Sequence, residues 1–188
     1  MSKELFVAKV PIGLLGDFES LDPNQTGSID IHIQLYRKVS NVEVILERIV
    51  EINKDNELVA NGFTVGTSNE RISKFKRCYL AIKPEMVVST DHVTHSVCRA
   101  IANVLNDKTV TGNLSTEILY FLGGSTSVTS CIEQMSIPKG QNSLPLLLVG
   151  IISNLAQDDV SNLIDGELDD LENLPKYTDV DAIIKVSV

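Results

Sequence analysis

The chain has 188 residues, of which 43% are hydrophobic, and it carries a net charge of −9. This length and composition suit one well-filled core and are short for two domains. The negative charge argues against an independent, high-affinity nucleic-acid binder, because phosphate contacts dominate such affinity and need a basic face. The sequence has no run of about 18 apolar residues and no leader-like start, so we expect no membrane partner and no secretion.

The charge is unevenly placed along the chain. Residues 156–188 hold nine acidic side chains and two lysines, a balance of −7, so the remainder sums to only −2. A weak contact with RNA through a local basic patch is therefore compatible with the composition.

The cysteine and histidine positions indicate neither a metal site nor a cofactor. Cys78, Cys98 and Cys131 are odd in number, far apart and set in apolar surroundings. This pattern is typical of reduced, packed thiols in a cytoplasmic and/or nuclear protein. His92 and His95 lie three residues apart, but a third ligand and the glutamate of an HExxH motif are missing.

The positions of glycine and proline and the spacing of apolar residues predict the first elements of the chain. Residues 1–28 form an N-terminal extension rich in glycine and proline, within which residues 5–10 can form an edge strand. Residues 29–36 alternate apolar and polar side chains, which predicts a half-buried strand with His32 on its solvated face. Ser40 or Asn41 then begins a helix through about Val50, with an apolar stripe of Val42, Ile45, Leu46 and Ile49.

Residues 51–76 have a weak pattern and are interpreted as an insertion or a loose connection. The densest basic cluster of the chain lies at its end and consists of Arg71, Lys74, Lys76 and Arg77. Two interpretations stay open for this cluster, a solvated loop and a phosphate contact.

Residues 78–82 predict a short strand, and one of Ser89, Thr90 and Asp91 begins a helix that ends near Leu105. A nine-residue run over 114–122 contains aromatic and β-branched side chains, which predicts a strand buried on both faces. Gly123 and Gly124 end this run because glycine accepts unusual backbone angles.

A helix is predicted after the two glycines. One of Ser125, Thr126 and Ser127 begins it, and Val128, Cys131, Ile132 and Met135 recur at helical spacing. The whole unit is a strand, a polar turn that suits an anion, and a helix.

The C-terminal third contains one more buried strand, at residues 146–152. A short acidic helix over 158–164 and a last helix beginning near Thr178 and Asp179 follow it. The order of elements predicts an α+β fold: a single two-layer domain with a four- to five-stranded, mainly antiparallel sheet packed against helices.

No pattern in the chain indicates catalysis. The sequence lacks a GxSxG motif and a distinctive Cys/His signature, and the turn at residues 123–127 lacks the lysine of a P-loop. Glu117 has no acidic partner nearby, so a structural hydrogen bond is its expected role. We therefore predict that the protein is not an enzyme.

Several short words of the sequence resemble one family when they are taken together and in order. They are Asn113-Leu114, Glu117-Ile118-Leu119, Val128-Thr129, Cys131-Ile132, Ser136-Ile137, Pro84-Glu85-Met86-Val87-Val88, His92-Val93 with Val97 and Ala100, Gly166-Glu167-Leu168-Asp169-Asp170, and Asn173-Leu174-Pro175. This set resembles the TPRKB-like proteins, the small kinase-binding subunits of the KEOPS (EKC) complex. The resemblance assigns residues 29–188 to a TPRKB-like domain and leaves residues 1–28 and 51–76 uncovered. A long final helix that is usual in the family is expected to be absent.

The resemblance implies a non-catalytic accessory subunit. Such a subunit docks on the small atypical kinase of KEOPS and helps to present tRNA for threonylcarbamoylation of an adenosine. We expect any tRNA contact to be weak and local, with the 3′ end as its target. The candidate tRNA-binding residues are Arg71, Lys74, Lys76, Arg77, Arg99, Lys108, Asn113, Gly124, Ser125 and Ser127.

One alternative from a different functional class stays open. A small domain could use the turn at residues 123–127 to bind an anionic ligand, or to act on one as an enzyme.

Overall fold

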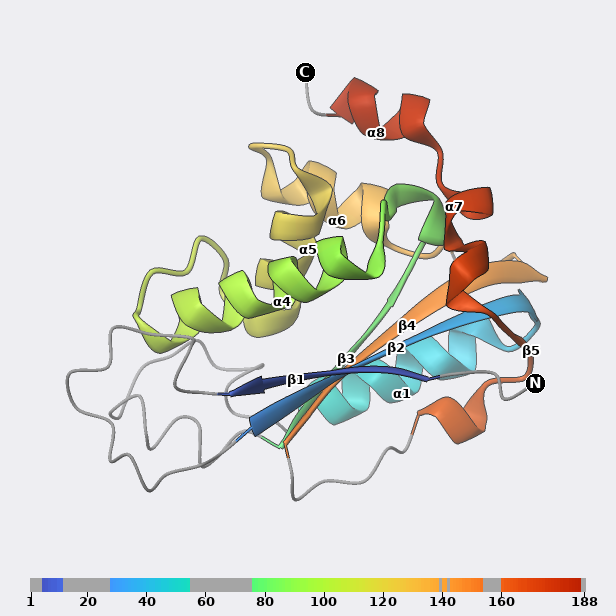
Figure 1. Cartoon of the computed structure of the whole chain (residues 1–188), viewed down its shortest axis with the longest axis horizontal. Coiled ribbons are helices and arrows are strands. Elements are labelled where there is room, and N and C mark those ends of the chain that lie inside the picture. Colours follow the sequence, from blue (N-terminus) through green and yellow to red (C-terminus); the bar gives the residue numbers. More distant parts are fainter. Residues whose placement is uncertain are drawn as a thin grey trace.

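The computed structural model describes residues 5–11, 28–54, 76–138, 140–141, 143–153 and 160–186. In chain order the elements are β1 (Phe6–Pro11), β2 (Ser28–Val39), α1 (Val42–Lys54), β3 (Arg77–Ile82), η2 (Pro84–Met86), α4 (Thr90–Leu105), α5 (Leu114–Gly123), α6 (Val128–Met135), β4 (Leu144–Ser153), η3 (Ser161–Leu163), β5 (Glu167–Asp169), η4 (Leu171–Asn173), α7 (Leu174–Tyr177) and α8 (Val180–Val186). Figure 1 shows helices gathered above one antiparallel sheet, with α1 on its other side.

The five strands pair antiparallel in the order β1-β2-β4-β3, and β5 also pairs with β2. β1 lies opposite residues 28–33 of β2, and β5 lies opposite residues 35–37. β1 and β5 therefore follow one another along the same edge of β2. The α+β class and the antiparallel sheet that the sequence predicted are confirmed.

The two faces of the sheet carry separate hydrophobic clusters. Ile31 and Ile33 of β2 and Val149 of β4 point to the face covered by α4 and α5. Tyr79 of β3 and Leu148 of β4 point to the opposite face, where α1 packs. Because successive strand residues point to opposite faces, both faces of the central strands are buried. With α1, the molecule has a helical layer beyond the two layers expected.

β2 contains one extra residue near its end. Tyr36 lies opposite Leu146 and Val39 lies opposite Leu144, so three steps on β2 match two on β4. Lys38 takes the left-handed conformation, with φ of 54°. Such a β-bulge bends the strand and re-aims its side chains.

The helix predicted over residues 42–50 is confirmed and continues to Lys54 as α1, where Ile52 is also buried. The first residues of the expected insertion thus belong to this helix. The side chain of Asn53 donates to the carbonyl of Tyr79 (2.8 Å) and accepts from its N–H (3.0 Å). Residues 55–75 of the expected insertion lie outside the described residues.

Most other predicted elements are confirmed. β1, β3 and β4 match the predicted strands, and Ser89 caps α4 by accepting from the N–H of His92 (3.1 Å). His32 is half-buried, where the alternation predicted a solvated residue. The described part of the predicted acidic helix over 158–164 contains only the short 3₁₀ turn η3.

The three cysteines are free thiols, as expected, with Cys78 and Cys131 buried and Cys98 half-buried. Burial raises the pKa of Cys78 to about 12, so its thiol stays protonated. In the part of the chain that the structure describes, no helix is long and apolar enough to cross a membrane.

The prediction of a strand over residues 114–122 is wrong, because this segment is the helix α5. The side chain of Asn113 accepts from the N–H of Thr116 (2.9 Å) and caps the helix. Leu114, Ile118 and Leu122 recur every four residues and are all buried, which is a helical period. The short apolar run fitted both periodicities, and the N-cap decides between them.

The predicted strand–turn–helix unit is therefore a helical hairpin of α5 and α6. Gly124 ends α5 in the left-handed conformation, with φ of 64°. A Cβ added at Gly123 would lie 2.6 Å from the Cβ of Cys131, so the two helices approach too closely for any other residue.

We expect Ile118→Asp to destabilise the fold. The Ile118 side chain is fully buried against the sheet, and an unpaired carboxylate there would cost several kcal/mol, as an order of magnitude. Thermal unfolding measures the effect. The control is Val110→Asp, at a side chain that is 57% exposed; an equal midpoint for both variants would mean that α5 does not face the core.

Candidate functional site

The turn between α5 and α6 uses its own polar groups internally. The Ser125 hydroxyl accepts from the N–H of Ser127 (3.2 Å), and the Ser127 hydroxyl accepts from the N–H of Ser130 (3.4 Å). The thiol of Cys131 donates to the carbonyl of Ser125 (3.5 Å). Two backbone N–H groups that an anion would need are thus already bound, which weakens the turn as an anion site.

Arg99 lies on the surface formed by α4 and α5. Its guanidinium carbon sits 4.5 Å from the centre of the Phe121 ring, a cation–π contact. Tyr120 meets Phe121 edge to face, with ring centres 5.4 Å apart. Because Phe121 precedes Gly124 by three residues, the structure brings Arg99 close to the turn. One cation and two half-buried rings therefore lie together at this end of α5.

Lys108 and Asn113 belong to the opposite end of α5. Lys108 is exposed in the loop that follows α4, and Asn113 caps α5. The amide oxygen of Asn113 accepts from the Ser115 hydroxyl (2.8 Å) as well as from the N–H of Thr116. The role of Asn113 in this structure is local, and the helix separates both residues from Gly124, Ser125 and Ser127.

Glu117 organises the loop that carries Lys108. This side chain is fully buried and accepts from Asn103 Nδ2 (3.0 Å) and from the backbone N–H groups of Val110 (3.1 Å) and Thr111 (2.8 Å). The hydroxyl of Thr111 adds another bond (2.9 Å). No described cation pairs with it, and hydrogen bonds satisfy both of its carboxyl oxygens. The expected structural role of Glu117 is confirmed, although on a helix.

The basic cluster near residue 75 is only partly described. Arg71 and Lys74 lie outside the described residues. The carbonyl of Lys76 accepts from the N–H of Ser153 (2.9 Å), and Arg77 opens β3. Figure 1 places the start of β3 at the lower end of the sheet and the α5–α6 turn at the top. The structure therefore does not gather Lys76 and Arg77 with the turn into one site.

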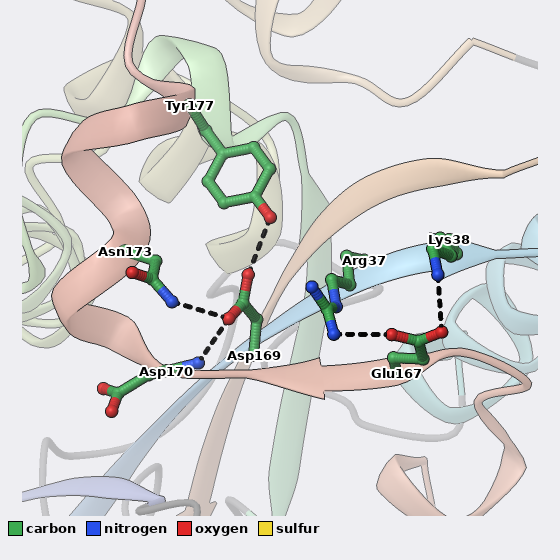
Figure 2. A network of polar contacts seen from close by, with 7 residues as sticks. All are labelled: Arg37, Lys38, Glu167, Asp169, Asp170, Asn173 and Tyr177. Atoms are coloured by element: carbon green, nitrogen blue, oxygen red, sulfur yellow. Dashed lines mark hydrogen bonds and ion pairs between the residues drawn. The ribbon is translucent and has the colours of Figure 1, made fainter.

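A second polar assembly, which the sequence analysis missed, lies where β5 meets β2 (Figure 2). The carboxylate of Glu167 pairs with Arg37 (2.7 Å) and with Lys38 (2.8 Å). These side chains are about half exposed, so the pairs add little to stability. Their contribution is geometric, because they fix where β5 lies. In the sequence, the only sign of these ion pairs is an adjacent Arg-Lys pair and an acidic residue far along the chain.

Asp169 is the centre of the same assembly. It accepts from Tyr177 Oη (2.7 Å), Asn173 Nδ2 (2.7 Å) and the N–H of Asp170 (2.9 Å). These three donors come from β5, η4 and α7 or from their junctions, as Figure 2 shows. A single carboxylate therefore sets the path of the chain from the sheet edge to the last helix.

The chain then reaches α8 through contacts with η2. The Thr178 hydroxyl donates to the carbonyl of Val87 (2.7 Å), and the N–H of Asp179 donates to the carbonyl of Glu85 (2.8 Å). Asp179 also caps α8 by accepting from the N–H of Ala182 (2.9 Å). This confirms the predicted start of the last helix. Figure 1 shows α8 at the outer end of the molecule.

α8 exposes an apolar stripe. Ala182 and Ile183 pack partly against the core, while Val180 and Ile184 are 60% and 57% exposed. Val180 and Ile184 lie four residues apart, on one helical face. Val88 is 54% exposed in the segment that holds the start of α8. We call Val88, Val180 and Ile184 the α8 patch.

The described residues contain no group of three His, Cys, Asp or Glu side chains that could hold a metal ion. Burial lowers the pKa of His92 below its ordinary value of 6.5.

We expect acid to loosen the attachment of β5. The hydrogen bond from Lys38 and the nearby Arg37 hold the pKa of Glu167 below its ordinary value of 4.5. Burial raises the pKa of Asp169, but bonds from Tyr177, Asn173 and Asp170 outweigh burial and hold it below 3.8. Because both pKa values are lower in the folded protein, the two carboxylates stabilise the fold fully above their ordinary values, 4.5 for Glu167 and 3.8 for Asp169. This stabilisation is lost as the pH falls through their lower pKa values in the folded protein.

Carboxyl NMR titration measures these midpoints. In Lys38→Gln the midpoint of Glu167 should rise towards 4.5 while that of Asp169 stays low. An unchanged Glu167 midpoint in this variant would contradict the assignment.

Comparison with known proteins agrees with the motifs. Residues 36–186 match the family described as "Kinase binding protein CGI-121". The chain is 22% identical to the EKC/KEOPS complex subunit CGI121 of Coccidioides immitis, over 83% of this chain and 68% of that protein. It is 21% identical to the corresponding Aspergillus fumigatus subunit, over 74% of this chain and 62% of that protein. It is 20% identical to the corresponding Aspergillus terreus subunit, over 71% of this chain and 57% of that protein.

The chain thus spans between 57% and 68% of the length of these relatives. Their names confirm the resemblance to a small KEOPS/EKC subunit, and the family match covers most of the described residues. The chain belongs to the CGI-121 family of kinase-binding proteins.

Proposed function

We propose that this protein is a non-catalytic accessory subunit of the KEOPS/EKC complex, working in the cytoplasm and/or the nucleus. It docks on the small atypical kinase of the complex and helps to present tRNA for threonylcarbamoylation. The family description and the names of the relatives support the kinase as a partner. The observation that carries the docking proposal is the α8 patch.

The α8 patch has the properties of a small docking surface. Three branched apolar side chains are each more than half exposed, on and beside a helix whose other face packs against the core. Burying an exposed Val or Ile side chain contributes about 1.5–3 kcal/mol. The patch therefore offers a partner several kcal/mol of apolar burial at a defined place.

The charge around the patch narrows the choice of partner surface. Described residues 160–186 contain seven acidic and two basic side chains, a balance of −5. Asp179 and Asp181 are exposed at the start of α8. An apolar patch with an acidic surround fits a kinase surface that is apolar at its centre and basic at its rim.

We expect the double variant Val180→Asp/Ile184→Asp to weaken kinase binding at least tenfold, because two carboxylates would replace the apolar burial. Titration calorimetry with the purified kinase measures the affinity. The matched control is Val44→Asp, at a side chain on α1 that is 55% exposed. If both proteins bind as tightly as the unmodified chain, α8 is not the docking surface.

For tRNA, the α4–α5 surface is the better-supported contact. Arg99, Tyr120 and Phe121 combine a cation with aromatic rings, and unpaired bases stack on such side chains. Lys108 lies beyond the other end of α5, where a phosphate could reach it. The turn at residues 124–127 contributes less than the sequence predicted, because its hydroxyls and N–H groups bond one another. This internal bonding also leaves the alternative role, an anionic-ligand or enzyme site at the turn, with less support.

We expect Arg99→Glu and Lys108→Glu each to weaken tRNA binding by a similar factor across tRNA sequences, since phosphate contacts carry no sequence information. Gel-shift titrations at several salt concentrations measure both affinity and salt slope. The slope of log affinity against log salt should be shallow, on the order of two to four. A tRNA without its single-stranded 3′ end should bind less well than intact tRNA.

The control for these charge reversals is Lys54→Glu. Lys54 ends α1, on the opposite face of the sheet from α4. Equal affinities for Arg99→Glu, Lys108→Glu and Lys54→Glu would show that the α4–α5 surface does not contact tRNA.

A further inference from the structure

The C-terminal segment over residues 165–186, which we call the strap, is attached at three places. At its start, the N–H of Ser40 donates to the carbonyl of Asp165 (2.9 Å), and the N–H of Asp165 donates to Asn41 Oδ1 (2.9 Å). Next, β5 pairs with β2, and at its end Thr178 and Asp179 bond to the segment around η2. The strap therefore crosses from the junction of β2 and α1 to the start of α4.

Apolar contacts hold the strap down but do not fix its direction. Leu174 is buried, and Leu171 and Tyr177 pack partly against the same cluster as α4 and α5. Hydrophobic burial is non-directional, so these side chains alone would permit several poses. Hydrogen bonds and ion pairs have preferred geometry and can select one pose.

The bulge in β2 supplies two directed contacts at once. Successive residues of a regular strand point to opposite faces, so Arg37 and Lys38 would normally diverge. With Lys38 at φ of 54°, both side chains reach the two oxygens of Glu167 instead. A positive φ at a residue with a Cβ is unfavourable, which makes this geometry a feature that the rest of the fold must maintain.

Asp169 adds further directed hydrogen bonds along the strap. It is half-buried and accepts from donors that lie one, four and eight residues later in the chain. Figure 2 shows Arg37 between the two carboxylates, and its charge helps to lower the pKa of Asp169 as well as that of Glu167. The two acids of β5 thus connect β2 to α7: Glu167 binds Arg37 and Lys38, and Asp169 binds Tyr177, directly before α8.

We propose that the Arg37–Lys38 bulge, Glu167, Asp169 and Tyr177 form a positioning device that fixes the pose of the strap and, through it, presents the α8 patch. This inference rests on the proposed docking of the kinase at that patch. A helix already held in its bound pose loses less freedom when a partner binds, so affinity rises without any direct contact from the device. The five residues are positioning residues, and none belongs to the α8 patch.

Hydrogen exchange of the full-length chain tests the positioning without any partner. In Tyr177→Phe and in Asp169→Asn, backbone amides of α8 should exchange about tenfold faster, because a hydrogen bond to a charged group is lost. Amides of β4 should keep their protection, which shows that the core remains folded. The matched control is Tyr120→Phe, at a half-buried tyrosine of α5. Equal α8 exchange in Tyr177→Phe and Tyr120→Phe would overturn the proposal.

The bulge is tested separately from Asp169. Lys38→Gln, which loses a contact with Glu167, should raise α8 exchange, whereas Arg48→Gln, which disrupts a surface pair with Glu51 on α1, should not. Matching exchange in these two variants would remove the bulge from the device.

Kinase affinity then separates this inference from the proposed function. Tyr177→Phe should weaken binding by up to the factor seen in exchange, and Val180→Asp/Ile184→Asp should weaken it further. If only the α8 variant weakens binding, the docking surface stands and the link between pose and docking is overturned. If neither weakens it, docking at α8 fails, while the exchange data still decide whether the device positions the strap.

Discussion

The whole structure depends on β4, a strand whose two faces are both buried. Residues 146–152 are buried without interruption, between β2 on one side and β3 on the other. Val149 contributes to the cluster under α4 and α5, and its neighbour Leu148 contributes to the cluster under α1. Gly150 leaves room for the ring of Tyr79, since a Cβ there would lie 2.9 Å from it. The two hydrophobic clusters are therefore tied together through one strand, and neither helical layer can shift alone.

This constraint explains which parts of the molecule are free to carry function. α5 and α6 are held by a close helical contact at Gly123, and Glu117 fixes the loop before α5 with buried hydrogen bonds. Buried contacts therefore hold both ends of α5 in place beneath the α4–α5 surface. The strap instead lies outside the central strands and rests on half-exposed polar contacts. Leu174 anchors the strap in the core, whereas its solvent-exposed polar contacts open more easily, and partner-binding elements are often drawn from such regions.

The sequence predicted the elements whose signal is local and periodic. Alternation predicted β2, an apolar run predicted β4, and the capping residues Ser89, Thr90 and Asp91 predicted the start of α4, among which the structure selects Ser89. The segment of α5 predicts a strand because its nine residues fit both the strand and the helix period, and only the cap at Asn113 distinguishes the two. The network around Asp169 could not be predicted, because Arg37 and Glu167 are 130 positions apart and only the register of β5 on β2 joins them. Lys108 and Arg99 could be recognised as cations, but their distribution along the helical hairpin is a property of the tertiary structure.

The pairing of Asn53 with Tyr79 has a consequence for how copies of this protein behave at high concentration. Among the described strands, β3 is the outermost on its side of the sheet. An outermost strand with unpaired backbone groups is a template onto which a strand of another molecule can add. The amide of Asn53 occupies both the N–H and the carbonyl of Tyr79, as a neighbouring strand would. The Asn53 side chain at the end of α1, together with the bridge between Ile82 and Ser136, thus covers part of this edge and opposes growth of the sheet into an intermolecular aggregate.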